Sequence, residues 1–217
     1  LQPQRQTVTT ELPGRTTAYL SAEIRPQVGG IVQKRLFTEG AQVKAGQVLY
    51  QLDDAGFAVA LASAEATQAK ARSAVTTAET NARRNAELVK IDAISRQVYD
   101  DSQAVLSQAR ADLGVATAAV ENARINLGYT RIKAPIGGRT TTSTVTPGAL
   151  VTANQTGALT TISQIDPLYV DVTQSTTDVL RLKRDMAQGR FQQADSGSAR
   201  IQLLLEDGST YPHPGRL

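Results

Sequence analysis

The decamers TEGAQVKAGQ (residues 38–47) and TPGALVTANQ (residues 146–155) are one short motif written twice. They are identical at six of ten positions and lie 108 residues apart. At the same offset, IRPQVGG at 24–30 lies over IKAPIGG at 132–138. Both copies contain short apolar alternations such as QVLYQL at 47–52, broken by glycine turns, which is typical of small β-strands. Because so short a sheet cannot bury a core alone, we predict that the two copies face each other in one small sandwich.

The residues between the two copies have a helical pattern. Residues 57–91 and 95–127 contain no proline, alanine recurs throughout, and Gly114 is the one interruption. Large apolar residues recur every seven positions in the second segment, and three of them are followed three residues later by alanine. The first segment repeats this spacing more weakly. The positions of this seam are Tyr99, Leu106, Leu113, Val120 and Leu127 with Ala109, Ala116 and Ala123, and Leu61, Val75, Ala82 and Val89 with Ala64, Ala71 and Ala78.

Heptad spacing is that of a coiled coil, so the two helices are expected to pack against each other along this seam. The link at 91–95 is short, which implies antiparallel neighbours and therefore a helical hairpin. At 1.5 Å per residue, such a hairpin would extend for about 50 Å. Its eight basic and eight acidic residues cancel, which is typical of a solvated helical surface.

A third, β-rich region follows the second copy. Residues 164–172 alternate as a strand, and residues 175–189 have a helical pattern with Ser175 or Thr176 as the N-cap and Gly189 as the C-terminal stop. Residues 200–205 are predicted to form a strand that ends in a turn at 206–209 and has no closing partner. Residues 6–12 also alternate, and we expect them to pair with these late strands. The region is thus expected to be an incomplete domain built from both ends of the chain.

Composition excludes several classes of function. The 23 basic residues are scattered among 20 acidic ones without a basic face or stacking aromatics, so no nucleic-acid partner is expected. With no cysteine and one histidine, His213 in a proline-rich turn, neither a metal site nor nucleophilic catalysis is supported. No apolar run is long enough to span a bilayer, and the chain begins without a signal sequence, so we expect any targeting or lipid-anchoring segment upstream of Leu1.

Adjacent carboxylates do not form a catalytic pair either. Asp53 with Asp54, and Asp100 with Asp101, are neighbours in sequence, so on a helix their side chains would splay by about 100°. The first pair directly precedes the first predicted helix, where a carboxylate can cap free amides. We therefore expect no enzyme activity and no cofactor.

The repeated motif resembles the two halves of a lipoyl or biotinyl carrier domain. VKAGQVLYQLD at 43–53 is similar to the first half, and APIGGR at 134–139 with VTPGALV at 145–151 is similar to the second. Carrier domains have a modified lysine in the turn that joins the halves. Residues 52–57 contain no lysine and lead into the predicted hairpin, so a carrier subunit of an enzyme complex is the lower alternative.

A split lipoyl-like module with a hairpin in its turn resembles the periplasmic adaptor proteins, also called membrane fusion proteins. TELPGRTTAY at 10–19, RPQVGGIV at 25–32, ARINLGYTRIKAPIGGR at 123–139 and QIDPLYVDVTQS at 164–175 are similar to adaptors of tripartite multidrug efflux pumps of the resistance-nodulation-division (RND) type. The similarity covers essentially the whole chain, with a minor departure at Thr140-Thr141-Thr142.

The resemblance implies an elongated α+β multidomain fold. Its expected parts are a lipoyl-like β-sandwich at 21–55 and 128–163, an α-helical coiled-coil hairpin at 56–127 with its tip near 91–95, and a partial β-barrel with one short helix at 1–20 and 164–217. It further implies a non-enzymatic periplasmic subunit, anchored to the inner membrane, that forms a homo-oligomer, a hexamer in the assembled pump. This subunit would link an inner-membrane RND transporter to a TolC-type outer-membrane channel. The alternative is an adaptor of a type I secretion or macrolide-type exporter.

The resemblance also points to residues at the hairpin tip. The family's channel-contact motif is an Arg, a Leu four residues later and a Ser seven residues after that, and it falls on Arg84, Leu88 and Ser95. Each residue also has an ordinary structural interpretation. Ser95 sits where an N-cap of the second helix belongs, Arg84 fits a solvated surface, and Leu88 fits the seam, although Val89 already fills that heptad position.

Overall fold

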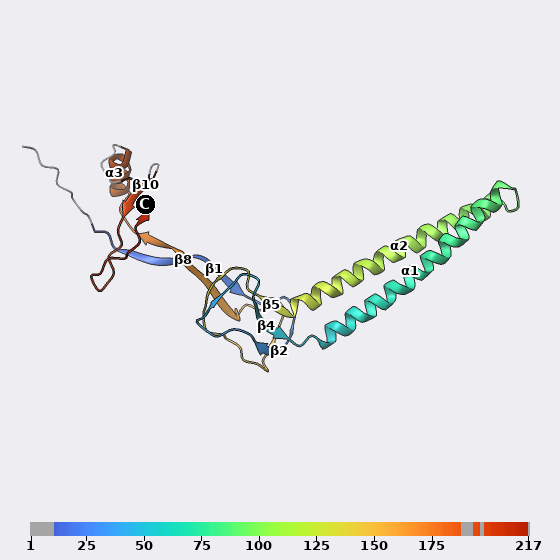
Figure 1. Cartoon of the computed structure of the whole chain (residues 1–217), viewed down its shortest axis with the longest axis horizontal. Helices are drawn as coiled ribbons and strands as arrows, with labels where there is room; N and C mark the ends of the chain where they lie inside the picture. Colours follow the sequence, from blue (N-terminus) through green and yellow to red (C-terminus); the bar gives the residue numbers. More distant parts are fainter. Residues whose placement is uncertain (1–10, 188–192, 196–197, 217) are drawn as a thin grey trace, which may run out of the picture. The chain divides into compact units, whose positions relative to one another are not determined.

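A computed structural model describes residues 11–187, 193–195 and 198–216 of the chain. The chain divides into two compact units. One unit is Ala18–Leu168, and the other combines Leu1–Thr17 with Tyr169–Leu217. The first unit contains the repeated motif and the helices between its copies (Figure 1).

Two four-stranded sheets form the sandwich that the repeat predicts. One sheet has the strand order β1-β8-β6-β3 and the other β5-β4-β2-β7. The short strands are β2 Gly30–Arg35, β3 Gln42–Val43, β4 Val48–Leu52, β5 Arg131–Lys133, β6 Gly138–Thr140 and β7 Leu150–Val151. The two long strands, which continue into the second unit, are β1 Gly14–Ile24 and β8 Thr160–Val172.

The two copies of the motif are joined by exchanging an edge strand. In β2 and β7, Gly30 is the register partner of Val151, and in β6 and β3, Gly138 is the register partner of Val43. These are the same two positions of the repeat, since each residue of the second copy lies 108 places after its equivalent. Neither copy therefore completes a sheet without the other, and the repeat builds one module with approximate twofold symmetry.

The turns of the two copies match as well. Gly40 and Gly148 have φ of 73° and 92°, and Gly46 and Asn154 have φ of 80° and 54°. All four lie in the left-handed region, which glycine and, among other residues, asparagine adopt most readily. The repeat thus preserves the backbone conformation of both turns, even where the residue has changed from Gly to Asn.

Large apolar side chains from both copies fill the space between the sheets. The fully buried residues of this core include Val32, Leu49, Tyr50, Leu52, Val151, Leu159 and Ile162. The hydroxyl of Tyr50 lies 2.6 Å from Ser143 Oγ and 3.2 Å from the carbonyl oxygen of Leu159, so its polar end is satisfied by the second copy. Burial raises the pKa of Tyr50, and the Ser143 hydrogen bond opposes that rise in part.

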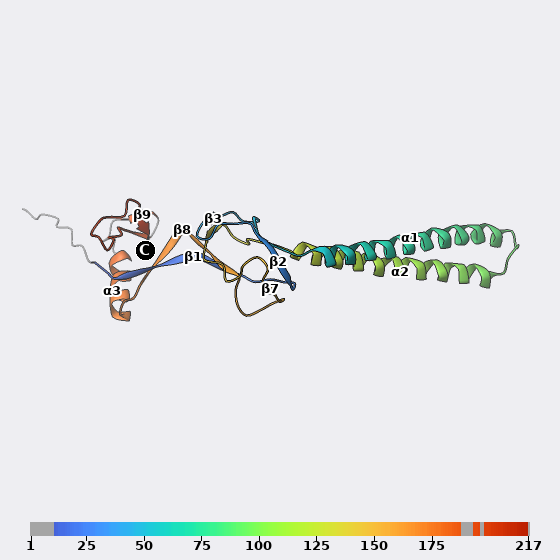
Figure 2. The same cartoon turned by 90° about the horizontal axis from the view of Figure 1, so that it is seen from below.

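Helices α1 Ala55–Lys90 and α2 Arg96–Tyr129 form the predicted antiparallel hairpin, and they lie side by side along their length (Figures 1 and 2). The heptad seam is confirmed: the most buried residues of the two helices are Val75, Ala78, Ala82, Leu106, Ala116 and Val120. The other predicted seam positions are half-buried, and these include Leu61 and Leu127 near the sandwich. Three polar contacts cross between the helices: a 3.0 Å hydrogen bond from Gln68 Nε2 to Thr117 Oγ1, a 2.8 Å ion pair of Arg110 with Glu79, and a 3.9 Å ion pair of Arg124 with Glu65.

The second unit contains the short helix α3 Thr176–Ala187 and a three-stranded sheet. Ser175 is the N-cap of α3, since its Oγ accepts a 3.2 Å hydrogen bond from the Asp178 amide. The sheet has the order β11-β10-β9, from β9 Gln193–Asp195, β10 Ser198–Ile201 and β11 Gly215–Arg216. The expected helix stop at Gly189 and most of the expected strand at 6–12 lie outside the described residues.

The predicted strand at 200–205 was wrong in its bounds and its pairing. Strand β10 ends at Ile201, and it pairs on one side with β9 and on the other with β11. The chain then folds back on itself, with a single bridge between Leu204 and Thr210 around Gly208, whose φ is 78°. The turn prediction at 206–209 is confirmed. Strand β10 ends early because its short partners β9 and β11 oppose it no further than Ile201.

Candidate functional site

The loop end of the hairpin begins where helix α1 ends. Ile91 is the C-cap residue, and Asp92 has a φ of 56°. The Asp92 amide donates to the Val89 carbonyl at 3.2 Å, and the Ala93 amide donates to the Leu88 carbonyl at 3.0 Å. This pair of bonds is a Schellman motif, which satisfies two of the carbonyls that a helix end leaves free.

Ser95 starts the second helix. Its backbone is extended, with φ −72° and ψ 154°, and its Oγ accepts a 3.3 Å hydrogen bond from the Val98 amide. The N-cap role expected from the sequence is therefore confirmed. Because the hydroxyl acts as an acceptor in this bond, its own proton can still be donated to a group outside the chain.

Arg84 and Leu88 lie in the last two turns of α1, and Ser95 lies at the N-cap of α2, so all three belong to the loop end of the hairpin. Arg84 and Ser95 are exposed, whereas Leu88 is half-buried, as is Val89 beside it. Arg84 and Leu88 are four residues apart, so they lie on one face of α1, a turn apart. Leu88 is thus shared between the seam and the surface, in keeping with Val89 also contributing to the seam.

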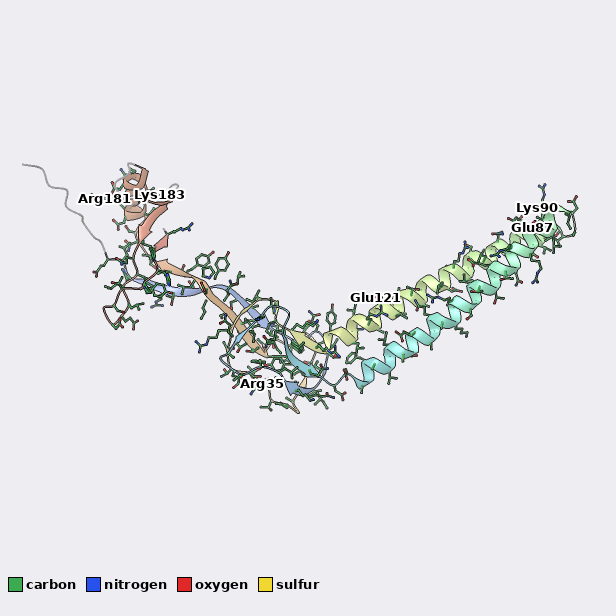
Figure 3. The ribbon with its side chains drawn as sticks, in the orientation of Figure 1. Arg35, Glu87, Lys90, Glu121, Arg181 and Lys183 are labelled. Atoms are coloured by element: carbon green, nitrogen blue, oxygen red, sulfur yellow. The ribbon has the colours of Figure 1, made fainter. Side chains whose placement is uncertain are left out.

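The charges around the tip are of both signs. Lys90 and Glu87 form a 2.8 Å ion pair near the loop, where both are labelled in Figure 3. Within the described part of the chain, no ion-pair partner is found for Arg84 or for Arg96, the first residue of α2. These two guanidinium groups are consequently available to carboxylates or carbonyl oxygens of a partner.

Sequence reasoning missed Ile91, which it treated only as part of the connection. Its side chain is 73% exposed at the C-cap of α1. The available signal was a β-branched apolar residue placed where the predicted helix ends, a position that needs no apolar side chain. Val98, in the first turn of α2, is also exposed, at 47%.

The opposite end of the hairpin contains no group that could hold a covalent arm. Strand β4 ends at Leu52 and α1 begins at Ala55, leaving a short link without lysine. Asp53 Oδ1 accepts hydrogen bonds from the Ala55 amide at 3.2 Å and from Gln33 Nε2 at 3.3 Å. Asp54 is the N-cap by position, but its side chain makes no capping bond, so the capping expected of this pair falls to Asp53.

The described residues include neither a metal-binding cluster nor a helix that could cross a membrane. They contain no group of three or more His, Cys, Asp or Glu side chains that could hold a metal ion. None of the helices in the same part of the chain is long and apolar enough to cross a membrane.

Comparison with known families decides what this arrangement belongs to. Residues 21–163 match the barrel-sandwich hybrid domain of RND membrane fusion proteins (MFPs), and residues 167–217 match the β-barrel domain of RND MFPs. The chain belongs to the RND membrane fusion protein family. The matched region 21–163 contains the sandwich together with the hairpin, so the RND MFP family shares the insertion of one into the other.

Similar proteins are found among curated efflux and multidrug resistance proteins. The chain is 49% identical, over its whole length and 55% of the relative, to the antibiotic efflux pump periplasmic linker protein ArpA of Pseudomonas putida. It is 48% identical, over its whole length and 53% of the relative, to the multidrug resistance protein MexA of Pseudomonas aeruginosa. The chain thus spans about half the length of the curated relatives it matches.

A solved structure shows the same fold. A chimera of MacA and MexA, which contains the MexA α-hairpin domain of Pseudomonas aeruginosa, is 26% identical to this chain with a TM-score of 0.57. The alignment covers 94% of this chain and 64% of the chimera. This similarity supports the α+β architecture of a split sandwich with an inserted hairpin.

Proposed function

We propose that this RND MFP chain is part of a periplasmic adaptor that links an inner-membrane RND transporter to a TolC-type outer-membrane channel in multidrug efflux. The observation that carries the proposal is the hairpin itself. It occupies the turn in which a carrier domain would hold its lysine, and it places a capped, two-helix end about 50 Å from the sandwich. A rigid spacer with a defined tip suits a protein that spans the distance between two partners.

The hairpin tip is the part that we propose to contact the channel. Arg84 would donate charge-assisted hydrogen bonds to carbonyl or carboxylate oxygens, since no ion pair holds it within the described residues. Leu88, half-buried one turn later, would provide apolar contact, and Ser95 would donate its hydroxyl proton while its oxygen caps α2.

The other parts have complementary roles in the proposal. The sandwich would pack beside those of other copies in a ring, a homo-hexamer in the assembled pump, around the conduit for exported compounds. The β-barrel region would rest on the transporter. The adaptor would lie in the periplasm, attached to the inner membrane, and its role would be structural and not enzymatic. Support comes from the names of the relatives, which describe periplasmic linkers of efflux pumps.

Two alternatives are less well supported. A carrier subunit would need a modified lysine in residues 52–57, and an intact-mass measurement that found a lipoyl or biotinyl adduct would favour it. An adaptor for a type I secretion or macrolide-type exporter would differ mainly in its transporter. The family match to RND MFPs disfavours this second alternative.

Leu88→Asp tests the proposed channel contact. In cells that rely on this adaptor for drug resistance, the variant in the full-length protein should abolish resistance while the folded adaptor remains as abundant as the wild type. Val59→Asp is the matched control, since Val59 is 70% exposed at the other end of the same helix, and it should leave resistance intact. Unchanged resistance in Leu88→Asp cells would contradict the assignment of the tip.

A further inference from the structure

Helix α1 keeps large apolar side chains off its surface for almost its whole length. Between Val59 and Ile91, a stretch that the structure describes in full, no large apolar residue is exposed. The exposed positions there are alanine, serine, threonine and charged or amide residues. Thr67, Thr76 and Thr80 bond their hydroxyls to carbonyls four residues earlier, so even these polar groups are satisfied within the helix.

This pattern changes at the last residue before the loop. Ile91 exposes 73% of its surface, whereas the nearby Leu88, Val89 and Ile94 are each half-buried. The hydrogen bonds that end the helix use only backbone atoms of neighbouring residues, so the Ile91 side chain does not form the cap. A polar residue would therefore serve the isolated hairpin at least as well, because an exposed isoleucine gains nothing from burial.

Spacing connects Ile91 with the residues already placed at the tip. Arg84, Leu88 and Ile91 are separated by four and three residues, which is the i, i+4, i+7 pattern with which a helix places one face into a groove. Val98 adds a second exposed aliphatic side chain from the start of α2. Arg84, which precedes this apolar set in the sequence, and Arg96, which lies between Ile91 and Val98, have no ion pair within the described residues. An apolar centre with a polar rim is the usual composition of a binding hot spot.

We propose that Ile91 is an apolar anchor that inserts into an apolar groove of the outer-membrane channel, with Val98 beside it and Arg84 and Arg96 bonded to acceptor oxygens at the rim. This rests on the proposed adaptor function. The partner surface it fits is an apolar groove bordered by carboxylate or carbonyl oxygens, since these complement two unpaired guanidinium groups.

The test compares Ile91→Ser with Val59→Ser in the full-length adaptor. The two wild-type side chains are β-branched, similarly exposed and on the same helix, at 73% and 70%, so the pair separates position from hydrophobicity. Ile91→Ser should weaken binding of the purified outer-membrane channel about tenfold, as expected for truncating an interface anchor, and Val59→Ser should leave it unchanged. Ile91→Leu, which keeps an apolar side chain at this position, should retain most of the wild-type binding.

Leu88→Asp in the same binding measurement separates the anchor from the proposed function. If Leu88→Asp prevents channel binding but Ile91→Ser behaves like Val59→Ser, the Ile91 anchor is overturned and the adaptor function stands. If Leu88→Asp has no effect on binding either, the proposed tip contact itself is wrong. A change in the adaptor's oligomeric state on Ile91→Ser, with channel binding unaffected, would assign Ile91 to contacts between copies and would overturn the anchor too.

Discussion

The sandwich and the hairpin belong to one compact unit, but the side chains packed inside the sandwich are much larger than those packed inside the hairpin. The sandwich buries Leu49, Tyr50 and Ile162 completely in a core shared by two sheets. The hairpin has a single narrow seam in which alanines such as Ala78 and Ala116 are among the most buried residues. The sandwich therefore supplies most of the apolar burial, while the hairpin supplies length and a tip. A spacer of this kind needs enough packing to keep two helices in register and little more.

The largest effect of this difference should appear on truncating a core residue. Ile162→Ala leaves a cavity between the two sheets, which cannot move together to fill it. The substitution should lower the free energy of unfolding by about 2–5 kcal/mol. Leu106→Ala in the hairpin should fall at the lower end of that range, because small neighbours allow the helices to approach. Urea denaturation followed by circular dichroism measures both. Equal losses would show that the seam is as tightly constrained as the core.

The twofold repeat gives a sharper comparison inside the sandwich. A Cβ on Gly138 would lie 2.5 Å from the carbonyl oxygen of Ser163, whereas the nearest neighbour of a Cβ on its equivalent Gly30 would be Leu52 at 3.6 Å, an ordinary contact. Gly138→Ala should therefore lower the free energy of unfolding by about 1–3 kcal/mol. Gly30→Ala should change it by much less in the same denaturation experiment. A similar loss at both positions would contradict the asymmetry.

Tyr50 gives the sandwich a pH dependence. Since burial raises the Tyr50 pKa in the folded protein, the folded state holds this proton at pH values at which the unfolded chain has released it. Stability from this group should be fully present below pH of about 10 and should fall as pH rises beyond it. Denaturation midpoints measured from pH 8 to 11 check this. Tyr50→Phe should flatten the decline, and an unchanged slope would assign it to other groups.

The smallest effect is expected on the hairpin surface. Gly114 lies inside α2 with open space around it, since nothing would lie within 4 Å of an added Cβ. Gly114→Ala should raise helix stability by about 0.5–1 kcal/mol, because alanine loses less backbone entropy in a helix. Thermal melting at the helical circular-dichroism band would detect this gain. A loss of stability would reveal a constraint on this face that the free chain does not explain.

The sequence predicted the features that arise from periodicity. Heptad spacing located the seam because burial in a coiled coil follows residue number directly, and the 108-residue repeat located the sandwich for a similar reason. The exchange of edge strands was not predicted, because register depends on contacts between residues far apart in the chain. The prediction of a strand at 200–205 failed because β10 pairs only with the short strands β9 and β11, which oppose it no further than Ile201, and local alternation does not reveal the length of a partner strand.

The candidate site was predicted only in part, for a related reason. The capping role of Ser95 follows from local chemistry and was found. Ile91 was missed because an exposed apolar residue is recognisable only once the helix end and the burial of its neighbours are known. The proposed channel contact of Arg84, Leu88 and Ser95 is still a prediction, and it depends on a partner.

Site-specific cross-linking in cells tests the central claim most directly, because the chain has no cysteine of its own. One cysteine is introduced in the full-length adaptor at Ala93, exposed in the loop, or at Ala62, exposed near the start of α1. It is labelled with a short maleimide that carries a photoactivatable diazirine, which on irradiation inserts into bonds of whatever protein lies beside it. If the tip meets the channel, Ala93→Cys should give an adduct that contains the outer-membrane channel and Ala62→Cys should not. Channel adducts from Ala62→Cys alone would contradict the account.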